Sequence, residues 1–246
     1  MESILGIDIG GSGIKAALVD VDSGQLLGER KRVPTPEGAK PREVAASLAR
    51  LVSDYHYKGV AGCGFPAVIQ HGVAKTAANI HSSWIDLNVD RLLSEACGFP
   101  IFTGNDADVA GLAEMTFGAG RDQKGVVLVL TLGTGIGSAI FVDGVLVPNT
   151  EFGHLKIRGK DAETRASDAA RQAKNLSWKK YARRLQEYLD YIEALIWPDL
   201  IIIGGGISKQ SDEFLPLIKT KAKIVPAQLL NQAGIVGAAL FAKTRL

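Results

Sequence analysis

The chain has 246 residues, of which 46% are hydrophobic and 22% are charged, a composition typical of globular proteins and not of disordered ones. This length suits one large domain or two small ones, and a net charge of +2 says little about partners. Cys63 and Cys97 are the only cysteines, which excludes a disulfide framework and a Cys-x-x-Cys metal site. Strand-like sequence starts at Ile4 and Asp8 interrupts any apolar leader, so we predict no signal peptide and a cytoplasmic protein.

Residues 4–33 predict three strands, over 4–9, 14–19 and 26–33, joined by turns that contain glycine. The first turn is Gly10-Gly11-Ser12-Gly13, and the overlapping stretch Gly11-Ser12-Gly13-Ile14-Lys15-Ala16 matches the dinucleotide-binding fingerprint, which requires a helix after the glycines. A second strand follows here instead, so we predict a β-hairpin whose tip holds phosphate. Asp8 ends the first strand and either holds Mg²⁺ through water or is an ordinary turn aspartate.

The next part of the chain alternates between helix and strand patterns. Apolar spacing predicts helices over 41–57 and 90–98, and short strands over 60–65 and 101–103. The polar stretch between them contains Asn79, which is either a loop residue or a ligand for sugar hydroxyls. Asn105 and Asp106 then open a helix that reaches about Phe117. Either residue suits a helix N-cap, and the alternative for Asp106 is a general base at a strand end.

Residues 125–142 form a run of eighteen residues without a charge, long enough to raise the question of a membrane span. Glycines and hydroxyl residues interrupt the run, so we predict strand, loop and strand, with no membrane partner. The loop is Thr131-Leu132-Gly133-Thr134-Gly135-Ile136-Gly137-Ser138. Its glycines let backbone N–H groups approach an anion, and Thr134 and Ser138 add hydroxyl donors. The alternatives are a phosphate cradle and a plain tight turn.

A strand over 145–147 then leads to Glu151 and His154, which suggest a polar ligand next to the phosphate.

Basic residues accumulate from 151 to 184, where helical periodicity from about 166 to 197 is also present. The run is either a solvated helix face or a surface that binds a polyanion, and nucleic acid is not expected because no recognised binding motif accompanies it. A buried strand over 200–203 leads to Gly204-Gly205-Gly206, which leaves room for a base or ribose against the backbone. Residues 212–223 and 234–243 predict helices.

Five motifs occur in the order seen in sugar kinases of the ROK family, which this chain resembles over essentially its whole length. The motifs are Asp8-Ile9-Gly10-Gly11, Asn105-Asp106-Ala107, Leu132-Gly133-Thr134-Gly135-Ile136-Gly137, Glu151-Phe152-Gly153-His154 and Gly204-Gly205-Gly206. The segment from Ser177 through Lys209 is similar to the polyphosphate-using glucokinases and glucomannokinases of that family. The resemblance implies an α/β fold of two actin-like domains, of the hexokinase, Hsp70 and ribonuclease H type, with an interdomain cleft.

This resemblance also implies an activity, namely phosphorylation of glucose at its 6-hydroxyl with polyphosphate, ATP or both as donor, and Mg²⁺ as cofactor. Asp106 would be the general base, and the implied sugar ligands are Asn79, Asn105, Asp106, Glu151 and His154. The implied phosphate and nucleotide ligands are Asp8, Gly10, Gly11, Ser12, Gly13, Lys15, Thr131, Gly133, Thr134, Gly135, Gly204, Gly205 and Gly206. The basic residues considered for a polyphosphate path are Lys156, Arg158, Lys179 and Lys180.

The chain departs from the family pattern at two places. No cysteine follows Cys97, so the zinc motif of many family members is not implied, and Lys15 comes later than the lysine of typical ROK glucokinases. We expect domains over 1–104, joined by the C-terminal helix 234–246, and over 105–233. The resemblance implies a homodimer and leaves mannose open as a second sugar. Alternative functions are an ATP-only hexose kinase, a non-catalytic sugar sensor, and an actin-type assembly protein.

Overall fold

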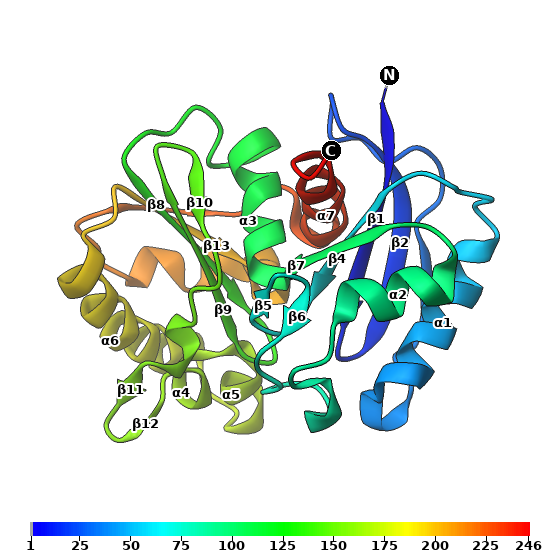
Figure 1. Ribbon diagram of the computed structural model, residues 1–246. Helices are drawn as coiled ribbons and strands as arrows, with labels where there is room; N and C mark the ends of the chain where they lie inside the picture. Colours follow the sequence, from blue (N-terminus) through cyan, green and yellow to red (C-terminus); the bar gives the residue numbers. More distant parts are fainter. Residues whose placement is uncertain (1) are drawn as a thin grey trace. The chain divides into compact units, whose positions relative to one another are not determined.

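The computed structural model describes residues 2–246, which divide into two compact units (Figure 1). The first unit comprises the chain up to Ala113 together with Gln232–Leu246, and the second comprises Glu114–Asn231. Helix α3 (Asp106–Phe117) contains the point of division. The expected mixed α/β fold with two such units is confirmed, whereas the domain limits at 104 and 233 stay predictions.

Both units contain a five-stranded sheet with the same topology. The first unit has strands β1 (Ser3–Gly10), β2 (Gly13–Asp20), β3 (Lys31–Val33), β4 (Ala61–Phe65), β5 (Ile69–Gln70), β6 (Val73–Ala74) and β7 (Ile101–Asn105), and helices α1 (Pro41–Ser53), α2 (Val89–Cys97) and α7 (Ala233–Lys243). Its main sheet has the order β3-β2-β1-β4-β7, in which β1 pairs antiparallel with β2 and parallel with β4.

The second unit repeats this order as β10-β9-β8-β13-β14. Its strands are β8 (Val126–Leu132), β9 (Ile136–Val142), β10 (Val145–Val147), β11 (Lys156–Ile157), β12 (Lys160–Asp161), β13 (Leu200–Gly204) and β14 (Lys223–Pro226), and its helices are α4 (Glu163–Ala166), α5 (Asp168–Ala173) and α6 (Trp178–Ile196). Here β8 pairs antiparallel with β9 and parallel with β13. Each sheet therefore begins with a hairpin whose turn is rich in glycine.

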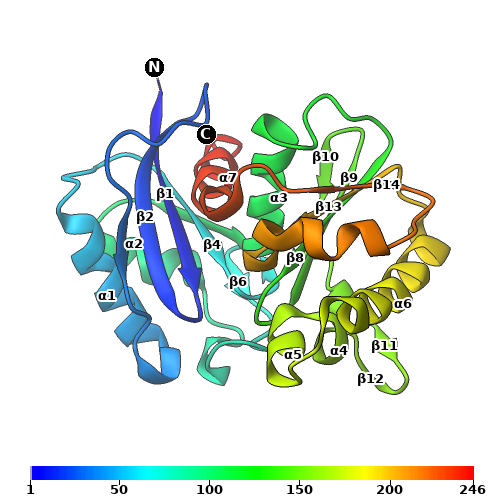
Figure 2. The same cartoon turned by 180° about the vertical axis from the view of Figure 1, so that it is seen from behind.

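In the first unit the two faces of β1 carry different residues, because side chains alternate along a strand. Leu5, Ile7 and Ile9 are buried in a core shared with residues of α1 and α2. Gly6 faces the other way, where a Cβ would overlap the Ile235 carbonyl of α7. Figures 1 and 2 show α1 and α2 on one side of this sheet and α7 on the other. The missing side chain at Gly6 thus lets α7 lie directly on the strand.

The core of the second unit forms between its sheet and the apolar face of α6. Tyr181, Leu185 and Tyr188 of α6 are fully buried in a cluster with residues of β8 and β13. Glu114, which is buried, accepts hydrogen bonds from the backbone N–H groups of Ala119 (3.0 Å), Gln228 (3.1 Å) and Leu229 (2.7 Å). This carboxylate therefore ties the first residues of the unit to its last.

Three predictions of secondary structure were wrong. The third strand covers only Lys31–Val33, since residues 26–30 join the sheet through a single bridge between Val19 and Leu26. The helix predicted over 166–197 is divided into α5 and α6, because Ser177 takes an extended conformation (ψ 154°) before α6 begins. Residues 206–217 form short 3-10 turns that include Pro216, and Lys223 starts an edge strand that pairs with β13.

The uncharged run over 125–142 forms β8 and β9. No helix within residues 2–246 combines the length and the apolar character needed to cross a bilayer.

Candidate active site

The first glycine hairpin joins β1 and β2 through a two-residue turn, Gly11-Ser12, flanked by the paired residues Gly10 and Gly13. Its carbonyl oxygens accept hydrogen bonds from side chains of the following segment: Thr35 Oγ1 donates to Gly10 O (2.5 Å) and Arg32 Nη2 donates to Ser12 O (2.9 Å). A Cβ at Gly11 would meet no atom within 4 Å, and this glycine does not have a positive φ. Neither packing nor backbone strain therefore requires glycine at this position, and the backbone of the turn is open on this side.

Asp8 and Lys15 lie opposite each other in the β1–β2 pairing and form an ion pair, with Lys15 Nζ 2.7 Å from Asp8 Oδ2. The Asp8 carboxylate also lies against the first turn of α7, where a Cβ on Gly234 would come within 3.1 Å of it. A helix N-terminus favours such an anion. One partly exposed carboxylate fits Mg²⁺ that keeps most of its waters and arrives with a phosphate ligand. No group of three or more potential metal ligands converges anywhere in residues 2–246.

The junction of β7 and α3 gives Asn105 and Asp106 different positions. Asn105 is buried and caps α3, since its Oδ1 accepts from Ala107 N (2.9 Å) and Asp108 N (3.2 Å). The N-cap interpretation therefore applies to Asn105. Asp106 is the first residue of the helix, half-buried, and its Oδ1 accepts from Ala107 N at 2.8 Å. This hydrogen bond orients the carboxylate that the sequence singled out as a base.

Asn79 lies in the irregular segment between β6 and the 3-10 turn Ser82–Trp84 and is exposed. Its role as a sugar ligand stays a prediction.

The second glycine hairpin joins β8 and β9 and is held by more protein contacts than the first. Gly133 donates its N–H to Gly135 O (3.0 Å), its carbonyl accepts from Ala169 N (3.0 Å), and Ile136 N donates to Glu163 Oε2 (3.2 Å). A Cβ at Gly133 would still meet nothing within 4 Å. The tip of this hairpin is therefore fixed in shape and open on its outer surface.

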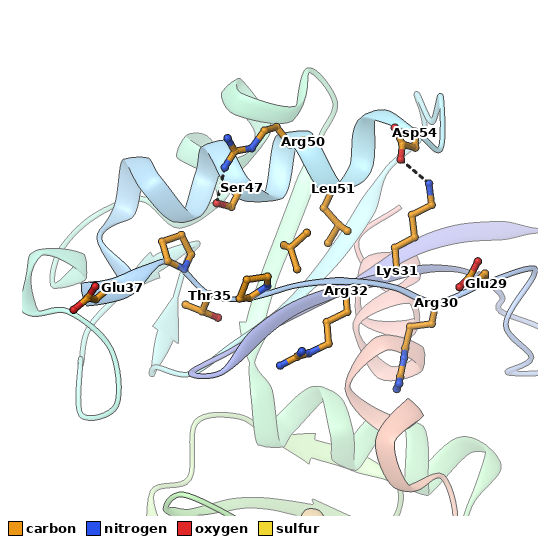
Figure 3. Close-up of a pocket in the computed structure, with 13 residues that line it drawn as sticks. Glu29, Arg30, Lys31, Arg32, Thr35, Glu37, Ser47, Arg50, Leu51 and Asp54 are labelled. Atoms are coloured by element: carbon orange, nitrogen blue, oxygen red, sulfur yellow. Dashed lines mark hydrogen bonds and ion pairs between the residues drawn. The ribbon is translucent and has the colours of Figure 1, made fainter.

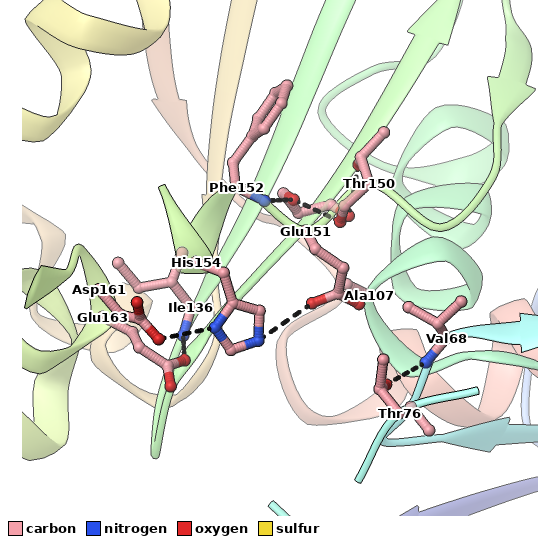
Figure 4. A network of polar contacts seen from close by, with 12 residues as sticks. Val68, Thr76, Ala107, Ile136, Thr150, Glu151, Phe152, His154, Asp161 and Glu163 are labelled. Carbon is pink, nitrogen blue, oxygen red and sulfur yellow. Dashed lines mark hydrogen bonds and ion pairs between the residues drawn. The ribbon is translucent and has the colours of Figure 1, made fainter. Parts of the chain in front are cut away.

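The expectation that Ser138 donates to phosphate does not fit the structure. Ser138 is buried; its Oγ donates to Thr150 O (2.6 Å) and accepts from Phe152 N (3.0 Å), while Thr150 Oγ1 donates back to Ser138 O (2.9 Å). These bonds attach the segment that carries Glu151 to β9 (Figure 4). Thr134, by contrast, is exposed at the hairpin tip, and Thr131 is half-buried near the end of β8.

Glu151 and His154 belong to a row of charged and polar groups (Figure 4). His154 Nε2 lies 3.7 Å from Glu151 Oε2, and His154 Nδ1 lies 3.1 Å from Asp161 Oδ2. Asp161 also pairs with Lys156 across the β11–β12 hairpin.

Burial raises the pKa of Glu151, with a smaller opposing effect from His154. Hydrogen bonds from Lys156 and then His154 hold the pKa of Asp161 below its usual range. Asp161 therefore stays ionised and orients the imidazole.

The third glycine group, Gly204-Gly205-Gly206, ends β13. Gly205 has a φ of +82°, and a Cβ there would collide with the backbone of Leu132, so only glycine suits this position. Gly206 meets nothing within 4 Å. The group therefore packs against the second hairpin while part of its backbone stays open.

The basic residues considered for a polyphosphate path have different surroundings. Arg158 pairs with Glu187 (2.6 Å), and Lys156 pairs with Asp161. Lys179 and Lys180 are exposed in the first turn of α6. The charges of Lys156 and Arg158 are thus paired within their own unit, as expected of a solvated surface. A polyanion-binding role stays a prediction for the exposed Lys179 and Lys180.

Sequence reasoning missed four residues around these groups: Arg32, Thr35, Asp161 and Glu163. Each forms a hydrogen bond or ion pair with a residue of the glycine turns or of the Glu151–His154 segment, but lies outside those motifs in the sequence. Strand alternation in 29–35 would have placed Arg32 on the same face as Lys15, but only with the register known.

Comparisons with known proteins give this arrangement a context. The family model described as the ROK family matches residues 4–166. Polyphosphate glucokinase of Mycobacterium tuberculosis (strain H37Rv) is 48% identical over 236 residues, which cover 96% of this chain and 89% of that protein. The crystal structure of the inorganic polyphosphate/ATP-glucomannokinase from Arthrobacter sp. strain KM matches with a TM-score of 0.97 and 50% identity, over 100% of both chains.

A ROK family glucokinase from Streptomyces griseus, in complex with glucose and AMPPNP, matches with a TM-score of 0.84 and 25% identity over 99% of this chain and 100% of that one. The fold is thus the actin-like fold of these sugar kinases, as the resemblance implied. Because the family model covers most of the chain and the glucomannokinase matches it from end to end, this protein belongs to the ROK family.

Proposed function

We infer that the protein is a glucokinase that transfers a phosphoryl group from inorganic polyphosphate or ATP to the 6-hydroxyl of glucose. The observation that carries this conclusion is the likeness, over the whole chain, to kinases that use polyphosphate. The local geometry agrees with it, since two open glycine hairpins, an oriented carboxylate and a Glu–His pair are the parts that such a reaction needs.

Asp106 is the proposed base. As the 6-hydroxyl oxygen forms its bond to phosphorus and the bond to the leaving phosphate breaks, the hydroxyl proton passes to the Asp106 carboxylate. The hydrogen bond from Ala107 N fixes the orientation of this group before substrate arrives. Positioning and electrostatics contribute most of the catalysis in phosphoryl transfer, so the base supplies one part of it, roughly 10²- to 10⁴-fold.

The sugar and the donor use different groups. We propose that Glu151, His154 and Asn79 hydrogen-bond the remaining hydroxyls of glucose. The Asn105 side chain caps α3 and would thereby position Asp106 at the start of that helix. The hairpin tips around Gly11 and Gly133 would cradle donor phosphates. Asp8 would hold Mg²⁺ through water, and that ion would neutralise charge on the donor phosphates. Gly206 would border the adenosine when ATP is the donor.

Three further properties belong to the same proposal. Mannose would be accepted as a second sugar, because it differs from glucose at one hydroxyl. The protein would act as a homodimer. It would work in the cytoplasm, a reducing compartment that suits the free thiols of Cys63 and Cys97.

The test is formation of glucose 6-phosphate by the purified protein with Mg²⁺, run in parallel with ATP and with long-chain polyphosphate, and repeated with mannose. Product from polyphosphate and from ATP is expected. Product from ATP alone would leave an ordinary ROK glucokinase. If neither donor yields product although calorimetry shows glucose binding, the kinase proposal fails and a sugar sensor replaces it.

A further inference from the structure

A row of charged side chains crosses three neighbouring strands of the first unit. Asp8 is opposite Lys15 between β1 and β2, and Lys15 is opposite Arg32 between β2 and β3. Directly opposed residues of antiparallel strands have their side chains on the same face of the sheet. Asp8, Lys15 and Arg32 therefore lie in one row beside the turn of the first glycine hairpin, and this row contains two cations and one carboxylate.

The ion pair within the row leaves the guanidinium without a matching charge. Lys15 Nζ lies 2.7 Å from Asp8 Oδ2, so the carboxylate is matched to the ammonium. Arg32 is exposed; within residues 2–246 it forms no ion pair, and its Nη2 donates to a neutral carbonyl, Ser12 O, at 2.9 Å. Like charges directly opposite each other on a sheet are destabilising. An anion bound beside Arg32 would offset this repulsion, so the row favours an anionic ligand there.

The neighbouring Lys31 is a contrasting cation on the same strand. Its Nζ lies 2.8 Å from Oδ2 of Asp54, the residue directly after α1. Figure 3 shows Lys31 pointing towards this carboxylate and Arg32 pointing to the other side of the strand. Successive side chains of a strand point to opposite faces. Strand β3 therefore directs one cation to a protein carboxylate and the other, Arg32, to the hairpin turn.

Gly13 makes room for the guanidinium at the turn. A Cβ on Gly13 would lie 2.6 Å from Arg32 Nε and 2.8 Å from Arg32 Nη2, so a side chain at this position would displace the guanidinium. The φ of Gly13 is not positive, so its backbone conformation does not itself require glycine. The guanidinium thus rests against Gly13, two residues from the open backbone at Gly11.

The remaining N–H groups of Arg32 decide what it can bind. A guanidinium has five N–H donors in a planar fork, and the bond to Ser12 O uses Nη2. The planar fork matches the oxygens of a phosphate group. Arg32 also covers a carbonyl oxygen that would otherwise repel an anion, and Thr35 Oγ1 does the same at Gly10 O (2.5 Å). The surroundings of the turn are therefore suited to phosphate.

We propose that Arg32 is a donor-binding residue whose guanidinium hydrogen-bonds a phosphate group held at the Gly10–Gly13 turn. This inference rests on the proposed function and deepens it, because it adds to the donor site a charged side chain from outside the glycine motifs. The contact is made to phosphate and not to adenosine, so ATP and inorganic polyphosphate share it. When the phosphoryl group leaves the donor, negative charge grows on the leaving phosphate, and a guanidinium on the donor phosphates stabilises that charge.

Calorimetric titration with tripolyphosphate and with ATP, both with Mg²⁺ and without glucose, tests this role. Arg32→Gln should bind both ligands roughly tenfold more weakly, as expected for a lost charge-assisted hydrogen bond. Arg32→Lys should lose less, because it keeps the charge but not the planar fork. Lys31→Gln is the matched control from the same strand, and its affinity for either ligand should change by less than about twofold. Glucose binding should be the same in all three variants.

Salt dependence separates a phosphate contact from a purely structural role of Arg32 at the turn. Raising the salt concentration from about 50 mM to about 500 mM should weaken binding by the wild type more steeply than binding by Arg32→Gln, because the variant lacks one screened charge interaction. An unchanged salt dependence would mean that Arg32 only supports the turn through Ser12, and the proposal would fail. Unchanged affinity for tripolyphosphate, or a loss confined to ATP, would also overturn it. Thermal unfolding checks that the variants remain folded.

Gly13→Ala provides an independent test that keeps every charge. The added Cβ displaces the Arg32 guanidinium, so this variant should bind tripolyphosphate about as weakly as Arg32→Gln does. Adding Gly13→Ala to Arg32→Gln should cause little further loss, because both changes remove the same contact. A further loss of equal size in the double variant would contradict the position assigned to Arg32.

The binding measurements involve no turnover, so the failure of this inference can be told from the failure of the kinase proposal. Glucose 6-phosphate formation from ATP, together with unchanged donor binding by Arg32→Gln, would remove the role of Arg32 and leave the proposed function standing. Tripolyphosphate binding that depends on Arg32, in a protein that forms no glucose 6-phosphate, would support the phosphate contact and contradict the kinase proposal.

Discussion

The two glycine hairpins have the same backbone plan but are supported in different ways. The β1–β2 hairpin is lined by the charged row Asp8, Lys15 and Arg32. The β8–β9 hairpin is held by neutral and backbone hydrogen bonds, together with the Glu163 carboxylate, and it continues into the segment fastened by Ser138 and Thr150. Both leave an open outer surface, at Gly11 and at Gly133. The first hairpin therefore has charged side chains next to its tip, whereas the second is held in a fixed shape by hydrogen bonds.

This difference predicts how the reaction parameters separate. Changes to charged groups of the first unit should appear in kcat and in donor use, because they act on a reaction in which negative charge moves. Changes around the second hairpin should appear mainly in KM for glucose, because Glu151 and His154 are proposed to hydrogen-bond the sugar hydroxyls.

The largest effect is expected for Asp106→Asn in the first unit. Asparagine keeps the shape and the position at the start of α3 but cannot take the hydroxyl proton. We expect kcat to fall by roughly 10²- to 10⁴-fold while glucose still binds in calorimetry. A variant that retains near wild-type kcat would remove Asp106 from the role of base.

Glu151→Gln in the second unit should raise KM for glucose by roughly 10- to 100-fold, the effect of losing a hydrogen bond to a charged acceptor, with a smaller change in kcat. Asp161→Asn is the companion variant: it weakens the contacts of Asp161 with His154 and Lys156 but leaves the Glu151 carboxylate in place, so it should raise KM for glucose less. A loss confined to kcat would contradict the division between the units.

Glu151 also predicts a pH dependence of KM for glucose. Burial raises the pKa of Glu151, so as the pH falls this carboxyl gains its proton earlier than an ordinary glutamate, and it then loses acceptor capacity. KM for glucose should therefore rise on acidification at pH values above the usual glutamate range. Glu151→Gln should lack this limb, and its presence in that variant would assign the titration to another group.

Gly11→Ala and Gly133→Ala compare the hairpins directly. A Cβ at either position meets no protein atom, so the melting temperature should stay the same, while kcat/KM for both donors falls by about tenfold because the methyl group occupies ligand space. Gly205→Ala is the contrasting variant: it should lower the melting temperature, since its backbone has a φ of +82° and no room for a side chain. Unchanged donor kinetics in Gly11→Ala would mean that this turn cradles no phosphate.

The smallest effect is expected at Lys179 and Lys180. Two cations in the first turn of α6 oppose the helix dipole, so reversing both charges should raise the free energy of unfolding by about 0.3–1 kcal/mol per residue. KM for polyphosphate should rise by only about threefold and KM for ATP less. Equal rises with both donors would take these lysines out of the polyphosphate path.

Much of the fold was predictable because the motifs are local. The strand patterns on either side of Gly10–Gly13 and Gly133–Gly135 predicted both hairpins, and the Asn105–Asp106 junction predicted the start of α3. The errors arose where a local pattern competed with tertiary pairing. Residues 212–223 have a helical pattern, yet Lys223 starts a strand because β13 has an open edge there.

Local sequence was enough to find the order of the glycine motifs, the carboxylate at the start of α3 and the lack of a cysteine-rich metal motif, because these depend on neighbouring residues. The contacts of each group, in contrast, follow from the tertiary structure. Strand register placed Arg32 next to Lys15, and packing on β9 turned Ser138 into an anchor for the Glu151 segment. Register and packing are set by contacts between residues far apart in the chain, so no local pattern could reveal them.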